Sequence, residues 1–295
     1  MQESPSPMPN KAGTRLDQLR NALQPETRFT RLNRRIRMVL IVVGIPYLVL
    51  FLYALFFSDK IIFQPEPLQL RAPADILKLK DSAGTSIAAL YLPNENATRT
   101  ILYSYGNAED IEAVRSELQK LHDLGFAIMA YDYPGYGFSG GSPSEQGAYR
   151  AIDAAYAHLT QTLKIAPENI VIMGRSLGGG VSVDLAAREK IGGLILQSTF
   201  KSAFRVLTNW RILPFDKFNS IGKIRNVKCP ILITHGTADE VISFQHGTTL
   251  FEAANEPKQF YPVPGARHNN VVGVGGKAYE KALLDFLNSL PPPSK

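Results

Sequence analysis

Residues 169–180 read N-I-V-I-M-G-R-S-L-G-G-G, and this short stretch decides the fold class. An apolar, β-branched run ends directly at Gly174, and a helix-compatible run, 177–189, begins directly after Ser176. The pattern Gly-x-Ser-x-Gly at 174–178 therefore lies on a strand–turn–helix junction. The flanking glycines remove side chains that would block so tight a turn. This junction predicts a serine whose hydroxyl is exposed at the carboxyl end of a strand.

A second glycine-rich stretch, G-Y-G-F-S-G-G at residues 135–141, matches two motifs but fits the context of neither. The dinucleotide-binding pattern G-x-G-x-x-G opens a helix directly, whereas here a Gly-Ser-Pro loop continues to Ser144. The same loop argues against Ser139 as a nucleophile, because no helix follows it at once. We therefore expect no nucleotide cofactor, and we expect residues 135–141 to shape a wall of the site.

From residue 99 onward, short apolar runs alternate with segments of helical periodicity, which is typical of βα units around a mostly parallel sheet. Residues 75–93 precede them as two strands joined by a turn. Functional residues of such sheets lie on loops at the carboxyl ends of the strands. The predicted strands are 99–105, 126–133, 169–174, 193–199, 229–236 and 258–263, and the predicted helices are 110–123, 145–163, 177–189, 244–254 and 276–289.

A serine hydroxyl needs a general base to act as a nucleophile, and the base needs an orienting carboxylate. On a junction of this kind the chain order is serine, acid, histidine. His268 follows the last predicted strand and is the expected base for Ser176. Asp239 directly follows a strand and is the expected acid, with the adjacent Glu240 as the alternative. His235 has no strand-end acid between itself and Ser176, so we interpret it as a supporting residue.

Acyl transfer to a serine also requires two backbone N–H donors for the oxyanion. One donor is expected from Leu177, the residue after the nucleophile. The other is expected from the loop S-Y-G-N-A-E-D, where Gly106 lets the backbone come close. Asn107 is the expected donor of this loop, with Ala108 as the alternative.

Residues 38–57 contain no charge over twenty positions and predict a single transmembrane helix. At about 1.5 Å per residue this segment spans the roughly 30 Å of a hydrocarbon core. A cleaved signal peptide is the alternative, but Leu-Phe-Phe-Ser at 55–58 makes a poor cleavage site. Five arginines precede the segment, and only Asp59 and Lys60 follow it closely. The positive-inside rule then predicts a cytoplasmic N-terminus and a catalytic domain outside the cytoplasm, in the periplasm or a lumen.

The distribution of charge excludes a nucleic-acid footprint on the main domain. Eight basic and three acidic residues within 1–37 supply +5 of the net charge of +6, which leaves +1 for the rest of the chain. The single cysteine, Cys229, excludes an internal disulfide and a cysteine-based metal cluster, and we expect no metal and no cofactor. The predicted parts are a basic, largely disordered tail at 1–37, the anchor at 38–57, a linker or edge strand at 58–74 and the catalytic domain at 75–290.

Several motifs together resemble those of the Bem46-like and ABHD13/ABHD17-like serine hydrolases of the α/β-hydrolase superfamily. They are GNAEDI, YDYPGYGFSGGSPSEQG, GRSLGGGVSVDLAAR, LPFDKF, HGTADEVISFQHG and GARHNN, in this order over about residues 60–290. The resemblance implies an α/β-hydrolase fold, with Ser176, Asp239 and His268 as the catalytic residues. Tyr105 stands where the family usually has a histidine, and the N-terminus lacks the cysteines of the depalmitoylating members.

The stretch between the strands 193–199 and 229–236 holds an insert at about residues 200–224, which is rich in aromatic side chains. It is expected to pack on the sheet edge and to form a short apolar lid that suits acyl chains. We therefore expect a membrane-anchored serine hydrolase that cleaves carboxylic esters or thioesters of small acyl or lipid-like substrates through an acyl-enzyme. A serine peptidase on the same fold and a non-catalytic binding protein are the alternatives.

Overall fold

The computed structural model describes residues 15, 17–20, 28–67, 71–208 and 210–293. The chain divides into two compact units, residues 1–56 and 57–295. Of the tail expected at 1–37, residues 1–14, 16 and 21–27 lie outside the described residues.

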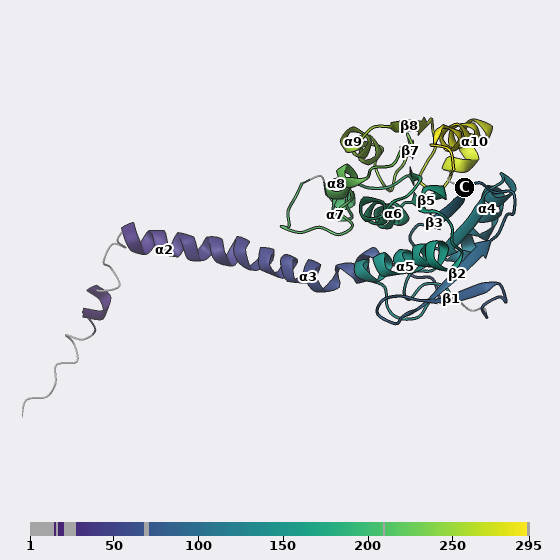
Figure 1. Cartoon of the computed structure of the whole chain (residues 1–295). Helices are drawn as coiled ribbons and strands as arrows, with labels where there is room; N and C mark the ends of the chain where they lie inside the picture. Colours follow the sequence, from purple (N-terminus) through teal and green to yellow (C-terminus); the bar gives the residue numbers. More distant parts are fainter. Residues whose placement is uncertain (1–14, 16, 21–27, 68–70, 209, 294–295) are drawn as a thin grey trace, which may run out of the picture. The chain divides into compact units, whose positions relative to one another are not determined.

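The second unit is built on one sheet, whose order is β1-β2-β4-β3-β5-β6-β7-β8 (Figure 1). The β1–β2 and β2–β4 pairs are antiparallel and all later pairs are parallel, so the mostly parallel sheet expected from the sequence is confirmed. The strands are β1 (Ile76–Lys80), β2 (Ser86–Leu92), β3 (Thr100–Ser104), β4 (Ala127–Tyr131), β5 (Ile170–Arg175), β6 (Gly193–Gln197), β7 (Ile231–Gly236) and β8 (Lys258–Val263).

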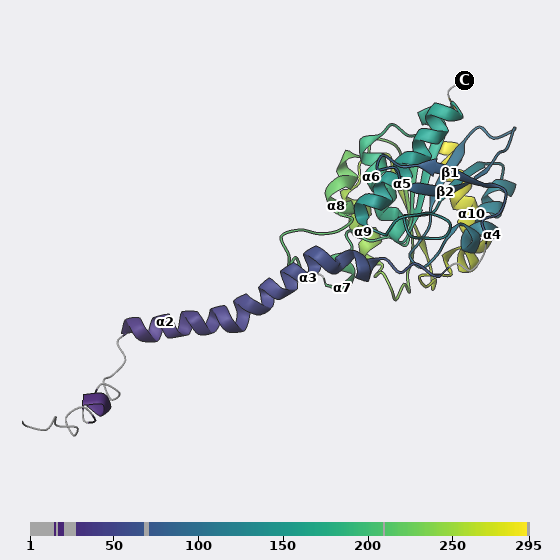
Figure 2. The ribbon, with the colours of Figure 1, turned by 90° about the horizontal axis from the view of Figure 1, so that it is seen from below.

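Helices cover both faces of the sheet, as Figures 1 and 2 show, with α5, α6, α8 and α9 on one face and α4 and α10 on the other. This cover explains why β3, β4 and β6 are buried along their whole length and read as unbroken apolar runs rather than as alternating patterns. The helices are α4 (Ile111–Asp123), α5 (Glu145–Ala157), α6 (Leu177–Arg188), α7 (Phe204–Leu207), α8 (Ser220–Lys223), α9 (Gln245–Ala253) and α10 (Val271–Ser289).

The register of the parallel strands brings their carboxyl ends to one edge of the sheet. Ser104 of β3 pairs with Gly174 of β5, and Arg175 pairs with Gln197 of β6. Gly236 of β7 pairs with Val263 of β8 in the same direction. The loops that follow these strands therefore start side by side, and they carry every site residue expected from the sequence.

The largest differences from the sequence-based expectation are at the two ends of the catalytic domain. Residues 58–62 are helical rather than part of a linker or edge strand, because the preceding helix meets no breaker before Pro65. The described part of residues 63–74 contains no strand. The last helix begins at Val271 rather than at residue 276, and it is interrupted at Gly276, where φ is 49°.

The N-terminal helical region consists of α2 (Arg28–Val39), a wider π-helical turn (Leu40–Gly44) and α3 (Ile45–Ile62). Pro46 lacks a backbone N–H, and such a residue is a common cause of a local change in helical winding. The helix Phe29–Ile62 is long and apolar enough to cross a membrane. Residues 28–37, which the sequence analysis had placed in the tail, belong to α2.

Candidate active site

Ser176 lies on the tight turn between β5 and α6. Its backbone has φ 51° and ψ −117°, which places a non-glycine residue in the sparsely populated region of positive φ. The amide of Ser176 donates to the carbonyl of Gln197 on β6 at 2.9 Å, and its carbonyl accepts from the hydroxyl of Thr199 at 2.8 Å. These bonds on both sides hold the strained residue in place.

The glycines around Ser176 are required by close packing of backbone against backbone. A Cβ on Gly174 would collide with Ser182 and with the backbone of α6. A Cβ on Gly178 would collide with the carbonyl groups of Ser104 and Tyr105 at the end of β3. The helix can therefore begin directly after the serine only where both positions lack a side chain.

The structure brings Ser176, His268 and Asp239 together from three different loops. His268 Nε2 lies 3.0 Å from Ser176 Oγ, and His268 Nδ1 lies 2.8 Å from Asp239 Oδ2. A carboxylate only accepts hydrogen bonds, so Nδ1 carries a proton toward Asp239. The other ring nitrogen, Nε2, faces the hydroxyl of Ser176. A serine, a histidine and an acid in this arrangement can activate the serine for nucleophilic attack.

Asp239 is buried and accepts hydrogen bonds on both oxygens. Its Oδ1 accepts from the amides of Val241 and Ile242 at 2.9 and 2.8 Å. Burial raises the pKa of the Asp239 carboxyl, but hydrogen bonds from His235, His268 and the Ile242 amide outweigh it and hold that pKa well below its usual value. The carboxylate therefore stays ionised beside the imidazole.

His235 supports the same carboxylate and lies away from the serine end of the chain of hydrogen bonds. The ring is fully buried, and its Nε2 donates to the carbonyl of Ile242 at 2.8 Å. The same nitrogen lies 3.2 Å from Asp239 Oδ2. His235 and His268 thus both approach Oδ2 of Asp239.

The alternative acid, Glu240, points elsewhere. It is exposed, its Oε1 lies 3.1 Å from Nε of Arg267, and its Oε2 accepts from the backbone amide of His268 at 3.4 Å. His246, on α9, is buried and accepts from the amide of Lys201, and burial lowers its pKa to about 4. Among the candidates weighed from the sequence, Asp239 is therefore the acid in contact with the His268 ring.

The expected oxyanion donors lie on the two backbone segments next to Ser176. Leu177 is the first residue of α6, where helix geometry supplies no intrahelical acceptor for the amide. On the other side, a Cβ built on Gly106 would lie 3.4 Å from Cβ of Ser176, so the loop after β3 packs directly against the nucleophile. Asn107 follows in this loop, and the alternative donor, Ala108, has a φ of 56°.

An ion pair that the sequence analysis did not identify ties this loop to the serine turn. Glu109 accepts from the amide of Gly106 at 2.9 Å and pairs with the guanidinium of Arg175, the residue before the serine. The pair links the loop after β3 to the end of β5. Both residues stand inside recognised motifs, but the spacing of 66 positions between them gave no signal that they meet.

Tyr105, which replaces the usual histidine, hydrogen-bonds to a buried carboxylate. Its hydroxyl donates to Asp132 Oδ1 at 3.0 Å, and the same oxygen accepts from the amide of Ile111. Asp132 Oδ2 accepts from the amide of Phe138 in the glycine-rich loop at 2.8 Å. Burial raises the pKa of Asp132 to about 6 despite these bonds. Asp132 thus joins α4, the loop after β3 and the loop 135–141.

Ser139 of the glycine-rich loop has a structural contact. Its hydroxyl donates to the carbonyl of Asp132 and accepts from the amide of Ala88 on β2, both at 2.8 Å. Its hydroxyl is therefore engaged on both sides, whereas the hydroxyl of Ser176 faces an imidazole nitrogen.

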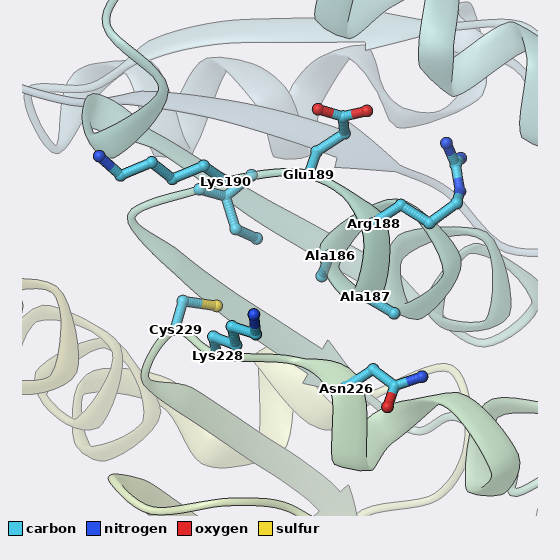
Figure 3. A pocket seen from close by; sticks show the side chains of 9 residues that line it. Ala186, Ala187, Arg188, Glu189, Lys190, Asn226, Lys228 and Cys229 are labelled. Carbon is cyan, nitrogen blue, oxygen red and sulfur yellow. The ribbon is translucent and has the colours of Figure 1, made fainter.

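A pocket of about 480 Å³ lies away from these residues, at the far end of α6 (Figure 3). Its lining includes Lys190, Lys228 and Cys229. Since α6 begins after Ser176 and ends at Arg188, the pocket belongs to the opposite end of the sheet. Burial raises the pKa of the Cys229 thiol to about 12, which leaves it a structural thiol rather than a nucleophile.

Among the residues that the structure describes, no group of three or more histidine, cysteine, aspartate or glutamate side chains is arranged to hold a metal ion. Ser176, His268 and Asp239 are joined by hydrogen bonds, and they form the candidate site.

The strand order, the flanking helices and the serine on its strand-to-helix turn define the class, and residues 99–217 match the family described as the alpha/beta hydrolase fold. The chain is 42% identical over 212 residues to alpha/beta hydrolase domain-containing protein 17B of Xenopus tropicalis, covering 70% of this chain and 73% of the relative. It is 41% identical over 213 residues to the human 17B protein, covering 71% and 73%. The chain therefore belongs to the alpha/beta hydrolase family, among the relatives of domain-containing protein 17, and is a hydrolase by that membership.

Solved structures of low sequence identity confirm the fold alone. An esterase of Pyrococcus furiosus superposes with a TM-score of 0.65 at 15% identity and covers 78% of this chain and 98% of its own. The esterase domain of a Rhodothermus marinus protein superposes with a TM-score of 0.56 at 17% identity, covering 72% and 97%. The family and the α/β-hydrolase fold expected from the sequence motifs are thus both confirmed.

Proposed function

We propose that this hydrolase cleaves carboxylic ester or thioester bonds through an acyl-enzyme formed on Ser176. The observation that carries the proposal is the continuous chain of hydrogen bonds from Ser176 Oγ through His268 to Asp239. In this proposal Ser176 is the nucleophile, His268 the general base and Asp239 the residue that orients and stabilises the imidazolium.

The reaction follows from the orientation of the His268 ring, whose Nδ1 faces Asp239 and whose Nε2 faces Ser176. His268 Nε2 takes the proton of the Ser176 hydroxyl as Oγ attacks the acyl carbon, and the carbonyl oxygen becomes an oxyanion. The amides of Leu177 and Asn107 are proposed to stabilise this oxyanion. Collapse of the intermediate breaks the bond to the alcohol or thiol, which receives the proton from His268. Water activated by the same ring then hydrolyses the acyl-enzyme.

The acyl character of the substrate is supported by the insert between β6 and α8. Phe204 and Phe215 pack edge to face at 5.9 Å, while Leu207 and Trp210 are 83% and 81% exposed. Large apolar side chains that are exposed on the insert suit contact with an apolar ligand or a lipid surface. A small acyl or lipid-like substrate is therefore the class we propose.

We further propose that residues 38–57 anchor the protein in a membrane with the N-terminus in the cytoplasm. Most apolar side chains of this segment are exposed, and water would disfavour so long an apolar surface. The arginines before it favour the cytoplasmic side for the N-terminus, and the catalytic domain would then lie on the other side. Protease digestion of sealed inverted vesicles tests this topology: a catalytic domain that is digested without detergent would contradict it.

Burst kinetics on a panel of p-nitrophenyl esters, acyl thioesters and short peptides test the proposed reaction. Formation of the acyl-enzyme releases the alcohol or thiol, so an acyl-enzyme that is hydrolysed slowly gives a burst of one leaving group per active site before the steady state. We expect turnover of esters or thioesters, with no turnover by Ser176→Ala. Turnover of the peptides alone would favour the peptidase alternative, and turnover of no acyl substrate would overturn the proposal.

A further inference from the structure

Residues 59–64 comprise the last turn of α3 and the two residues after it, and we call them the stem. It belongs to the same compact unit as the sheet. The carbonyl of Ile62 accepts from Nδ2 of Asn107 at 2.7 Å, and the amide of Gln64 donates to Oδ1 of Asn107 at 3.0 Å. The stem therefore binds both ends of one carboxamide, and that carboxamide belongs to the proposed oxyanion donor.

A tyrosine completes the same hydrogen-bonded group. The hydroxyl of Tyr136 donates to Oδ1 of Asn107 at 2.6 Å and accepts from the amide of Gln64 at 2.8 Å. Tyr136 lies in the glycine-rich loop 135–141 and is buried. The stem, the loop after β3 and the glycine-rich loop thus meet at the side chain of Asn107.

Apolar packing and an ion pair fix the stem in this place. Phe63 is 3% exposed and packs edge to face on Tyr136 at 6.1 Å and on Phe218 of the insert at 5.8 Å between ring centroids. Lys217 of the insert lies 2.9 Å from Asp59. The stem therefore contacts the loop after β3, the glycine-rich loop and the insert.

We propose that the stem is a positioning element for the oxyanion hole, acting through the side chain of Asn107. This inference rests on the proposed function, because it concerns the donor of the proposed reaction. With both ends of its carboxamide bound, Asn107 has little freedom to rotate, and its backbone amide keeps one direction relative to Ser176. The next residue, Ala108, has a φ of 56°, a conformation that persists only when neighbouring contacts hold it.

As a consequence, the stem would contribute to stabilisation of the transition state, and would not only connect the apolar helix to the rest of the chain. Asn107→Ala keeps the backbone N–H but removes every bond between the carboxamide and the stem. We expect kcat to fall about tenfold, which is less than the 10²–10³ typical of a lost donor, with KM changed less than about threefold.

A matched control separates positioning from folding. Asn255 also ties a loop through its carboxamide, with Nδ2 donating to the carbonyls of Arg225 and Val227 at 2.7 and 2.8 Å. These two partners precede β7, at its amino end, whereas Asp239 follows its carboxyl end. The full chain in detergent micelles is compared as wild type, Asn107→Ala and Asn255→Ala, with the melting temperature and kcat measured for each. We expect both variants to melt at lower temperature, and only Asn107→Ala to lose kcat per folded molecule.

Two further variants approach the same contact from its partners. Tyr136→Phe deletes only the hydroxyl that bonds Asn107 and Gln64, and Phe63→Leu loosens the stem while keeping an apolar residue. Each should lower kcat, and the loss in Tyr136→Phe combined with Asn107→Ala should be smaller than the product of the single losses, because both act on one contact. These variants also provide the test if Asn107→Ala does not fold.

The outcomes distinguish this inference from the proposed function. If wild type is not labelled by a fluorophosphonate on Ser176, the proposed reaction fails and the inference with it. If wild type is labelled and turns over, but Asn107→Ala and Tyr136→Phe retain its kcat, the stem has no positioning role. Equal losses of kcat in Asn107→Ala and Asn255→Ala would also overturn the inference.

Discussion

His268 Nε2 lies 3.0 Å from Oγ of Ser176, although 92 positions separate the two residues in the chain. The contact arises because β5 and β8 both end at the same edge of the sheet, with the serine on the turn after one strand and the histidine on the loop after the other. Asp239, on the loop after β7, meets the ring from the opposite side at 2.8 Å.

Asp239→Asn tests the acid directly. The amide cannot accept the Nδ1 proton in the same way, so the ring loses the tautomer that leaves Nε2 free to accept from Ser176. We expect kcat to fall by about 10³–10⁴ on an ester substrate with little change in KM. Glu240→Gln is the control, because Glu240 contacts Arg267 and the backbone of His268 rather than its ring. A large loss in Glu240→Gln and none in Asp239→Asn would exchange the two assignments.

The pH dependence of stability tests the environment of the same carboxyl. The folded state holds the pKa of Asp239 well below 3.8, the ordinary value of an aspartate side chain. Below about pH 4 the unfolded chain binds a proton at this position and the folded protein does not, so the stabilisation present above that pH is lost as the pH falls. Urea unfolding of wild type and Asp239→Asn across acidic pH should show a stability difference that shrinks below about pH 4. A difference that grows as the pH falls would contradict the depressed pKa.

Ser139→Ala separates the two Gly-x-Ser-x-Gly matches in the chain. Removal of the hydroxyl leaves the amide of Ala88 and the carbonyl of Asp132 without that partner. We expect a loss of about 1 kcal/mol in the free energy of unfolding, measured by urea denaturation, while kcat stays near that of wild type. An inactive but folded Ser139→Ala would show that this serine has a chemical role.

Gly178→Ala tests the packing of the serine turn. The new Cβ would collide with the carbonyl of Ser104, and since both sides of the contact are backbone, neither can move aside cheaply. We expect destabilisation of about 1–3 kcal/mol together with a loss of activity. Gly273→Ala is the matched control on α10, where a Cβ meets nothing within 4 Å. Equal effects of the two substitutions on thermal unfolding and kcat would contradict the packing argument.

Much of the fold could be predicted from local patterns. The central strands are buried runs, and the junction at 174–178 is fixed by glycines that no other residue can replace. Asp239 and His268 were chosen from the ends of the predicted strands and the chain order serine, acid, histidine. The structure brings His268 to Ser176 and Asp239 to His268. Their catalytic roles stay a prediction until they are measured.

What the sequence could not predict depends on contacts between distant segments. The stem binds Asn107 across 45 positions, and the pairing of Glu109 with Arg175 crosses 66. Helix α3 continues to Ile62, whereas the prolines after it suggested an earlier linker. The next residue, Phe63, packs on Tyr136, which lies 73 positions further along the chain. No repeating sequence pattern signals contacts between such distant residues, so they become visible only in the folded structure.

The most direct test of the account is the site of modification by a fluorophosphonate, mapped by mass spectrometry of the labelled full chain. The account predicts a single modified residue, Ser176, in wild type and in Ser139→Ala, and no modification in Ser176→Ala. An unmodified wild type, or equal modification of Ser176→Ala, would contradict the claim that Ser176 is the nucleophile of this hydrolase.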